Sequence, residues 1–282
     1  MRLCRYGKDG FEKPGIIDSE GKLRDLSKVV TSIGPNELSP RGLAMLSKVK
    51  PESLPVVSNS PRLGVPYVGI GKFVAIGLNF SDHAKESGLP IPSEPIVFSK
   101  ATTSISGPYD SVIQPRGSTK LDWEVELGVV IGSKAQYVAV DKALDFVAGY
   151  CVVNDVSERA FQMATSQWDK GKGFDTAGPI GPWLVTTDEI RDPQKLDMWL
   201  DLNGKRMQSG NTRTMIFSCA QIVSHVSQYM TLLPGDIITT GTPPGVGMGI
   251  KPTPVFLKPG DVMTLGIRGL GEQKQEVVST PG

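Results

Sequence analysis

The stretch Asp122–Ile131, DWEVELGVVI, joins an acidic pair to a run of strand-forming apolar residues. Side chains two residues apart lie on the same face of a β-strand, so Glu124 and Glu126 should point the same way, with Val125 and Leu127 opposite. Two carboxylates that close together repel each other unless a cation lies between them. A solvated strand face is the simpler explanation of the pair alone, so the metal-site interpretation needs a second observation.

A second apolar segment, 149–159 (GYCVVNDVSER), supplies that observation, because it ends abruptly in polar residues. Asp155 lies at its C-terminal edge. If the two strands are neighbours, Glu124, Glu126 and Asp155 bring three carboxylates together. Such hard oxygen ligands suit Mg²⁺ or Mn²⁺ and leave coordination positions for water and substrate. A turn or cap role explains Asp155 equally well on the local sequence.

The composition narrows the class of protein. The 282 residues include 30 Lys and Arg and 29 Asp and Glu, a formal net charge of +1. This balance argues against a nucleic-acid binder and a polybasic membrane binder. With 39% hydrophobic residues the composition is that of a globular protein, and 32 Gly and 22 Pro indicate many turns and a strand-rich fold. The three cysteines form no C-x-x-C motif, and neither an apolar leader nor a bilayer-length apolar run is present, so we expect a cytoplasmic protein.

The pattern of apolar residues and turn signals predicts short strands and few helices. A hairpin is expected over residues 15–26 with its turn at Ser19–Gly21, and a linker over 49–66 separates a small N-terminal domain (1–66) from the rest (67–282). Helices are predicted after Pro40, over 81–87 with Ser81 as N-cap and Gly88 as the stop, and over 218–229. Strands are predicted at 67–71, 73–77, 95–99, 122–132, 147–154, 182–186, 198–203, 236–240 and 262–268.

Several common catalytic motifs are absent. The sequence has no P-loop and no G-x-S-x-G nucleophile elbow. The glycine-rich stretch 241–249 follows a strand, but the Lys251-Pro-Thr-Pro run after it forbids the helix of a dinucleotide-binding fold. Only two histidines, His83 and His225, are present, which excludes a three-histidine metal site.

Six segments along the chain form a recognisable set. They are GLNFSDHAKE (77–86), PIVFSK (95–100), DWEVEL (122–127), NDVSER (154–159) with Gln162, KGFDT (172–176) and TGTPPGVG (240–247). Taken together, these motifs resemble those of the fumarylacetoacetate hydrolase family, in the family's order over about 67–268. The resemblance implies a mixed β-rich α+β fold, with a β-roll catalytic domain typical of that family and a small N-terminal α+β domain. It also implies a divalent metal, Mg²⁺ with Mn²⁺ possible, held by Glu124, Glu126 and Asp155, and a homodimer.

The same resemblance assigns catalytic roles to residues that the local sequence leaves open. It makes His83 the general base on a mobile lid, oriented by Glu86 three residues later, and Lys172 the cation beside a developing enolate. Taken without the resemblance, His83 reads as a surface histidine on a short helix. His225 and Lys170 are interpreted as a packing residue and a surface residue.

The resemblance also implies a set of substrate-binding residues on the following segments. Arg159 equally fits a structural ion pair, and Lys100 a solvated strand end. Asp82 is the nearest candidate for a fourth acidic ligand but falls on the lid, so three protein ligands are expected. The substrate-binding residues implied are Lys100, Arg159, Gln162, Gly241 and Thr242.

The implied reaction is metal-dependent hydrolysis of the C3–C4 bond of a 2,4-diketo acid. The chain looks most like the bacterial sugar-acid subgroup, whose substrate 2,4-diketo-3-deoxy-L-rhamnonate gives pyruvate and L-lactate. The alternatives are oxaloacetate decarboxylation, isomerisation, dehydration of a 2-keto-3-deoxy sugar acid, a ureidoglycolate lyase-like reaction, and a metal-dependent binding module without catalysis. The expected partner is a small keto acid, with no nucleic acid and no membrane.

Overall fold

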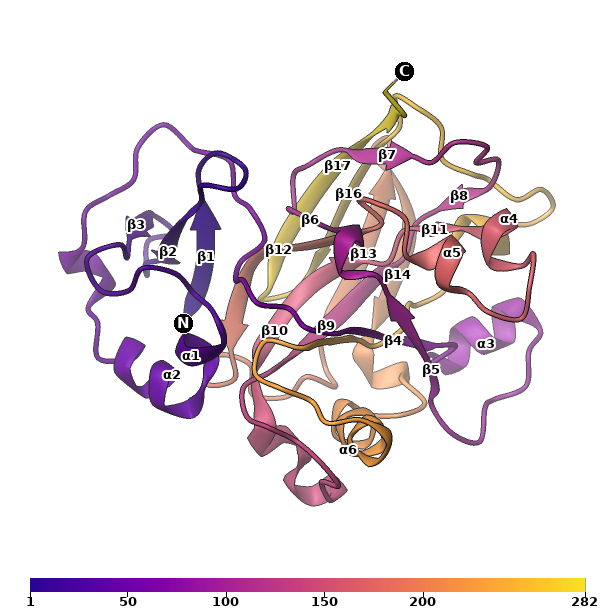
Figure 1. Cartoon of the computed structure of the whole chain (residues 1–282). Helices are drawn as coiled ribbons and strands as arrows, with labels where there is room; N and C mark the ends of the chain where they lie inside the picture. The colour runs from indigo at the N-terminus through magenta and orange to yellow at the C-terminus, as the bar shows by residue number, and fades with distance from the viewer. Residues whose placement is uncertain (282) are drawn as a thin grey trace.

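The computed structural model describes residues 1–281, and its centre is a ten-stranded mixed sheet (Figure 1). Gly282, the last residue of the expected catalytic domain, lies outside the described residues. The strands of the sheet are, in spatial order, β3 (Leu23–Asp25), β2 (Lys13–Ile17), β1 (Arg2–Tyr6), β12 (Gly178–Thr186), β10 (Val147–Asn154), β9 (Val125–Ile131), β15 (Ile237–Thr239), β4 (Phe73–Gly77) and β5 (Ile96–Lys100), while β6 (Ile105–Ser106) pairs with β12.

A second sheet of five strands lies against the first and closes the main core. Val125, Leu127 and Val129 of β9 belong to the same apolar cluster as Leu200 and Leu265 of the second sheet. Val130 on the other face of β9 belongs to a second cluster, so β9 is buried on both faces. Its uninterrupted apolar run follows from that position. The second sheet runs β14 (Lys205–Asn211), β13 (Asp197–Leu202), β16 (Val262–Ile267), β17 (Gly271–Ser279) and β7 (Val112–Gln114), and β8 (Leu121–Asp122) pairs separately with β11 (Ser157–Glu158).

Helices are short and lie at the edges of the sheets (Figure 1). The predicted helix over 218–229 is confirmed as α6, with Ile222, Val223 and Val226 fully buried. The α-helices are α1 (Pro35–Leu38), α2 (Pro40–Leu46), α3 (Ser81–Ser87), α4 (Arg159–Gln162), α5 (Asp169–Lys172) and α6 (Cys219–Tyr229), and the 3₁₀ turns are η1 (Pro51–Ser53), η2 (Thr102–Ser104), η3 (Val140–Phe146), η4 (Thr212–Thr214) and η5 (Gly247–Gly249).

The N-terminus of α6 provides a stability prediction. The Ser218 hydroxyl accepts the Gln221 N–H, and the Gln221 side chain accepts the Ser218 N–H in return. Replacing Ser218 with alanine leaves one of these donors without its partner, and we expect the free energy of unfolding to fall by about 1 kcal/mol. Ser209→Ala, at an exposed position in β14, is the control, with an expected change below about 0.5 kcal/mol. A denaturant midpoint measurement would contradict the prediction if both variants behaved alike.

The N-terminal segment, indigo to purple at the left of Figure 1, extends the main sheet. The predicted hairpin is confirmed as the β2–β3 pair, and β1 pairs with β12 through Leu3 and Leu184. Leu3, Ile16 and Leu46 join Leu184 and Ile237 in the second apolar cluster. One sheet and one core therefore cross the expected boundary at residue 66, and the division into two domains stays a prediction.

Two of the expected local features are wrong. Residues 67–71 form no strand, and α3 has Phe80 as N-cap while the Ser81 hydroxyl donates to the Thr214 carbonyl instead. Strands β14 and β17 were not predicted, because their inward faces carry the glutamines Gln208 and Gln273. These amides are buried among backbone polar groups, so the usual apolar alternation is missing.

The β-rich α+β fold class is confirmed by the two sheets and the short helices. Within residues 1–281, no helix combines the length and the apolar character that crossing a bilayer requires.

Candidate active site

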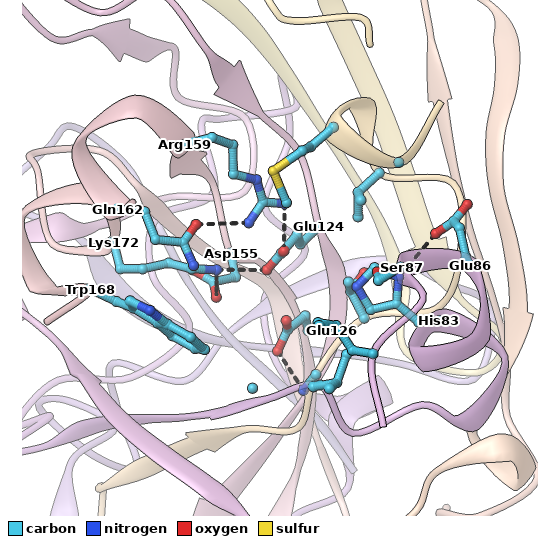
Figure 2. A pocket seen from close by; sticks show the side chains of 18 of the residues that line it. His83, Glu86, Ser87, Glu124, Glu126, Asp155, Arg159, Gln162, Trp168 and Lys172 are labelled. Carbon is cyan, nitrogen blue, oxygen red and sulfur yellow. Dashed lines mark hydrogen bonds and ion pairs between the residues drawn. The ribbon is translucent and has the colours of Figure 1, made fainter. Parts of the chain in front are cut away.

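The three predicted metal ligands meet at one end of the β9–β10 pair. Antiparallel pairing sets Glu126 opposite Val153, and the Asp155 N–H donates to the Glu124 carbonyl just beyond the ladder. Glu124 and Glu126 therefore point the same way, as the strand period predicted. One oxygen of each of Glu124, Glu126 and Asp155 lies within 4.8 Å of the others, and all three side chains are buried (Figure 2).

Buried cations surround this carboxylate cluster (Glu124, Glu126 and Asp155). The Lys172 ammonium lies 2.7 Å from both Glu124 Oε2 and Asp155 Oδ2, and the Arg159 guanidinium lies 2.6 Å from Glu124 Oε1. Burial alone would raise the pKa of Glu124, but Arg159 and Lys172 hold it well below its usual value. Burial opposes the charge on Lys172 as well, yet the carboxylates of Asp155 and Glu124 raise its pKa.

Glu126 differs from its two neighbours because no cationic side chain touches it. Its Oε2 accepts the Thr239 hydroxyl at 2.6 Å and the Gly241 N–H at 2.8 Å. Its Oε1 has no hydrogen-bond partner among residues 1–281. Burial, reinforced by the carboxylates of Asp155 and Glu124, raises the pKa of Glu126 well above its usual value. A buried carboxylate in this position is short of positive charge.

This shortage fits a divalent cation. The buried carboxylates of Asp122, Glu124 and Asp155 form one ion-pair network with three cationic side chains. The buried carboxylate of Glu126 lies beside this network, and among residues 1–281 no cationic side chain pairs with it. The open oxygen of Glu126 lies beside oxygens of Glu124 and Asp155, and three hard oxygens of this kind match Mg²⁺ or Mn²⁺. The cationic members of the network are Lys100, Arg159 and Lys172.

Lys100 was expected to touch substrate, and the structure places it elsewhere. Its side chain is fully buried behind the cluster, where the ammonium donates to Asp155 Oδ1 at 2.6 Å and also to the Lys172 carbonyl. Burial lowers the pKa of Lys100 in spite of Asp155. Lys100 does not line the cavity, because β5 turns its last side chain inward; it braces Asp155 instead, and it is not a solvated strand end either.

His83 and Glu86 lie on α3, across the cavity from Lys172 (Figure 2). His83 Nδ1 lies 3.0 Å from Glu86 Oε2, and since a carboxylate only accepts, the Nδ1 proton points at Glu86. In the neutral imidazole Nε2 would carry the lone pair, and no described residue bonds to Nε2. Glu86 also accepts the Gly245 N–H at 3.0 Å, so the short helix is fastened to the glycine-rich loop. This bond holds α3, the predicted lid, at the wall of the cavity.

The glycine-rich loop serves the cluster more than the sequence implied. The Gly241 N–H is taken by Glu126, and the Thr242 hydroxyl donates to the Val125 carbonyl at 2.9 Å. The Gly241 N–H and the Thr242 hydroxyl are therefore not free to bind a substrate carboxylate, although both residues were predicted to bind substrate. The Thr242 backbone N–H has no acceptor among residues 1–281, and Thr242 lines the cavity, so this amide is the available donor.

Arg159 and Gln162 lie on α4 beside the cluster. Arg159 combines its two expected roles, because it lines the cavity while its ion pairs go to Asp122 and Glu124. Gln162 accepts from Arg159 at 3.0 Å and keeps its amide N–H₂ free of protein partners within the described chain. Lys172 reaches the cluster because Gly171 lets α5 approach α4, where a Cβ would meet the Gln162 nitrogen at 2.4 Å.

One cavity of about 340 Å³ contains this site and runs from buried charges to an apolar mouth. The mouth carries Leu89, Met163 and Met248, which are 53%, 67% and 41% exposed. Phe98 and Trp168 form an edge-to-face pair on its wall. Sequence analysis did not predict these lining residues, since no spacing or polarity pattern marks them. Lys170 is exposed and His225 contacts Tyr229 at a ring distance of 5.0 Å, both as predicted.

Comparisons with known proteins give consistent matches. The family description "Fumarylacetoacetate (FAA) hydrolase C-terminal" matches residues 72–278. A relative from Burkholderia orbicola strain MC0-3, named "Putative hydrolase", is 61% identical over 98% of both chains. Neighbouring solved structures include isomerases as well as hydrolases.

Two solved structures share the fold along their whole length. A fumarylacetoacetate hydrolase from Exiguobacterium antarcticum has a TM-score of 0.90 at 34% identity and covers 99% of this chain and 100% of that one. A maleylpyruvate hydrolase from Sphingobium sp. SYK-6, in complex with manganese(II) and pyruvate, has a TM-score of 0.83 at 29% identity and covers 100% of both chains. The matches extend over nearly the whole chain, and the chain belongs to the fumarylacetoacetate hydrolase family.

Proposed function

We propose that the protein is a divalent-metal-dependent hydrolase that cleaves the C3–C4 bond of a 2,4-diketo acid and releases pyruvate. The observation that carries the proposal is one cavity with a histidine–carboxylate pair on one wall and a buried, cation-deficient carboxylate cluster on the other. The related maleylpyruvate hydrolase, solved with manganese(II) and pyruvate, supports both the metal and the product.

The residues divide the chemistry between them. A divalent cation held by Glu124, Glu126 and Asp155 would supply Lewis-acid polarisation of the substrate oxygens. His83 Nε2 accepts a proton from water while the water oxygen bonds to C4, and Glu86 keeps the imidazole in that tautomer. The C3–C4 bond then breaks with its electron pair on C3, and C3 takes up a proton to give pyruvate. The Lys172 ammonium faces the negative charge of the departing enolate.

The apolar residues at the mouth of the cavity would contact the part of the substrate beyond C4. In 2,4-diketo-3-deoxy-L-rhamnonate, the sugar acid predicted from the sequence, the tail beyond C4 carries one hydroxyl. Leu89, Met163 and Met248 offer no hydrogen-bond partner to a hydroxyl that leaves water. This lining favours an alkyl tail, and 2,4-dioxohexanoate differs from the sugar acid by that hydroxyl alone.

The test measures pyruvate and the second acid released from this matched pair of substrates and from oxaloacetate, with Mn²⁺ and with chelator. We expect equimolar pyruvate and a second carboxylic acid, with the rate falling about 100-fold or more under chelation. The apolar mouth predicts that 2,4-dioxohexanoate has at least the kcat/KM of the sugar acid.

Each of the other outcomes would support a different function or substrate. Turnover of oxaloacetate alone would replace hydrolysis by decarboxylation. Loss of the diketo absorbance without pyruvate would point to isomerisation, which the isomerases among the neighbouring structures make the second candidate. Mn²⁺ binding without turnover of any keto acid would favour a binding module. A higher kcat/KM for the sugar acid would favour 2,4-diketo-3-deoxy-L-rhamnonate, the substrate predicted from the sequence.

A further inference from the structure

Backbone N–H groups of the loop 241–249 donate hydrogen bonds to the carboxylates of Glu86 and Asp122, which are not among the three proposed metal ligands. The Gly245 N–H donates to Glu86 on the lid helix α3. The Gly247 N–H and the Met248 N–H donate to Asp122 at 2.6 and 3.1 Å. The loop therefore lies between the lid and the strand segment that leads to Glu124.

Asp122 is fully buried and serves both neighbours at once. Its Oδ1 accepts from the Trp123 and Gly247 N–H groups, and its Oδ2 accepts from the Met248 N–H and from Arg159 Nε at 2.9 Å. The same Arg159 guanidinium donates to Glu124 Oε1 at 2.6 Å. Asp122 thus holds the loop through the Gly247 and Met248 N–H groups. It also holds Arg159, which pairs with the proposed metal ligand Glu124.

Trp123, the next residue, also holds the loop, through a hydrogen bond between two uncharged groups. Trp123, also fully buried, donates its indole N–H to the Gly245 carbonyl at 3.0 Å. A Cβ at Gly245 would meet the Met207 carbonyl oxygen at 2.0 Å, and a Cβ at Gly247 the Val255 carbonyl oxygen at 1.9 Å. The backbone here is tightly enclosed, so a change in its contact with Asp122 or Trp123 has little room to relax locally.

We propose that Asp122 is a positioning residue that couples the metal-binding cluster to the position of the lid helix α3. Asp122 sets Arg159 against Glu124, and it holds the loop whose Gly245 N–H holds Glu86. The coupling rests on the proposed function only in treating His83 as the base. The contacts themselves concern the carboxylate cluster and the lid helix.

Asparagine at position 122 weakens both links whichever way its amide turns, because it removes the charge that pairs with Arg159 and leaves either the Met248 or the Gly247 N–H without its acceptor. Four donors point at the carboxylate, two at each oxygen. An amide nitrogen in place of Oδ2 faces the Arg159 and Met248 donors, and in place of Oδ1 it faces those of Trp123 and Gly247. A buried donor facing a donor loses its hydrogen bond and stays desolvated.

The test compares Asp122→Asn with Asp110→Asn in the full chain. Asp110 is a matched control, since it also accepts from an arginine Nε, that of Arg62 at 2.7 Å, and from a backbone N–H, that of Gly107 at 2.8 Å. For D122N we expect Mn²⁺ affinity, measured by electron paramagnetic resonance, to fall about 10- to 100-fold. Hydrogen exchange of residues 81–88 in metal-free protein should quicken about 5- to 10-fold. D110N should change neither quantity.

A second pair of variants separates coupling from loss of structure. Trp123→Phe removes only the bond to Gly245, and we expect faster exchange in 81–88 with unchanged Mn²⁺ affinity. Arg159→Lys cannot span Asp122, Glu124 and Gln162 together, and it should weaken Mn²⁺ binding and quicken lid exchange together. It replaces D122N if that variant does not fold. Normal Mn²⁺ affinity or normal lid exchange in D122N, or in R159K used in its place, would overturn the coupling. Neither readout needs substrate, so the result stands apart from the proposed reaction.

Discussion

Replacing Glu126 with glutamine should weaken Mn²⁺ binding by more than about 100-fold. Removing a residue that only hydrogen-bonds to a metal ligand already lowers metal affinity about 10- to 100-fold, and loss of a ligand itself should cost more. Glutamine keeps the shape and can accept the bonds from Thr239 and Gly241 through its one oxygen. Its amide N–H₂ then faces Glu124 and Asp155 in place of the open carboxylate oxygen. The cluster loses the negative charge that no side chain compensates, and hydrolysis should fall with metal affinity.

The same substitution should stabilise the metal-free protein above the usual glutamate pKa. Burial and the carboxylates of Asp155 and Glu124 raise the pKa of Glu126 in the folded state. The unfolded chain therefore releases this proton first as pH rises, and the folded state loses stability until its own, raised pKa is passed. Glu126→Gln lacks this loss. Its thermal midpoint without metal should exceed that of the parent, and the order should reverse with Mn²⁺.

Glu158→Gln is the matched control for this pair of effects. Glu158 is also fully buried, but it accepts the N–H groups of Lys120 and Phe161 and takes no part in the cluster. We expect a lower thermal midpoint with and without Mn²⁺, and unchanged Mn²⁺ affinity. A Glu126→Gln protein that bound Mn²⁺ normally would remove this residue from the ligand set.

Replacing His83 with alanine should lower the rate of diketo acid hydrolysis by about 10²- to 10⁴-fold. Among the described residues that line the cavity, His83 is the only histidine. Mn²⁺ affinity should not change, because His83 is not among the proposed ligands Glu124, Glu126 and Asp155. Single-turnover rates and Mn²⁺ titration together check both expectations.

His225→Ala is the control, because His225 is the other histidine and contacts Tyr229 on α6. It should leave hydrolysis unchanged. Decarboxylation of oxaloacetate requires no attacking water, so any such activity should survive His83→Ala far better than hydrolysis does. Equal loss of both reactions, or full hydrolysis in the variant, would show that His83 is not the base that activates water.

Much of the site could be predicted from the sequence because its residues follow short-range rules. The strand period set Glu124 and Glu126 on one face, and the end of an apolar run marked Asp155. The helix 218–229 was predicted from the helical spacing of its apolar residues Ile222, Val223 and Val226. Motif order implied the remaining positions, and the structure brings His83, Glu86, Arg159, Gln162 and Lys172 to the same cavity as the carboxylates.

The strands β14 and β17 could not be predicted, and neither could the true surroundings of Lys100 and Gly241. Gln208 and Gln273 read as surface residues until partners far along the chain satisfy them, such as Val125 and Val152. Lys100 reads as a solvated strand end until Asp155, 55 residues away in sequence, lies against it. Burial of a polar group depends on such distant partners, which no local pattern records.

The sequence by itself determined the strand-rich class. Spacing alone left the acidic cluster and the histidine–glutamate pair open, and only the order of the family's motifs implied them. Only the tertiary structure decided that Glu126 is the carboxylate left without a cation, that Gly241 serves Glu126 rather than substrate, and that Asp122 joins the cluster to the lid. Charge balance and hydrogen-bond satisfaction are properties of a packed site, because each depends on every group that shares the low-dielectric interior.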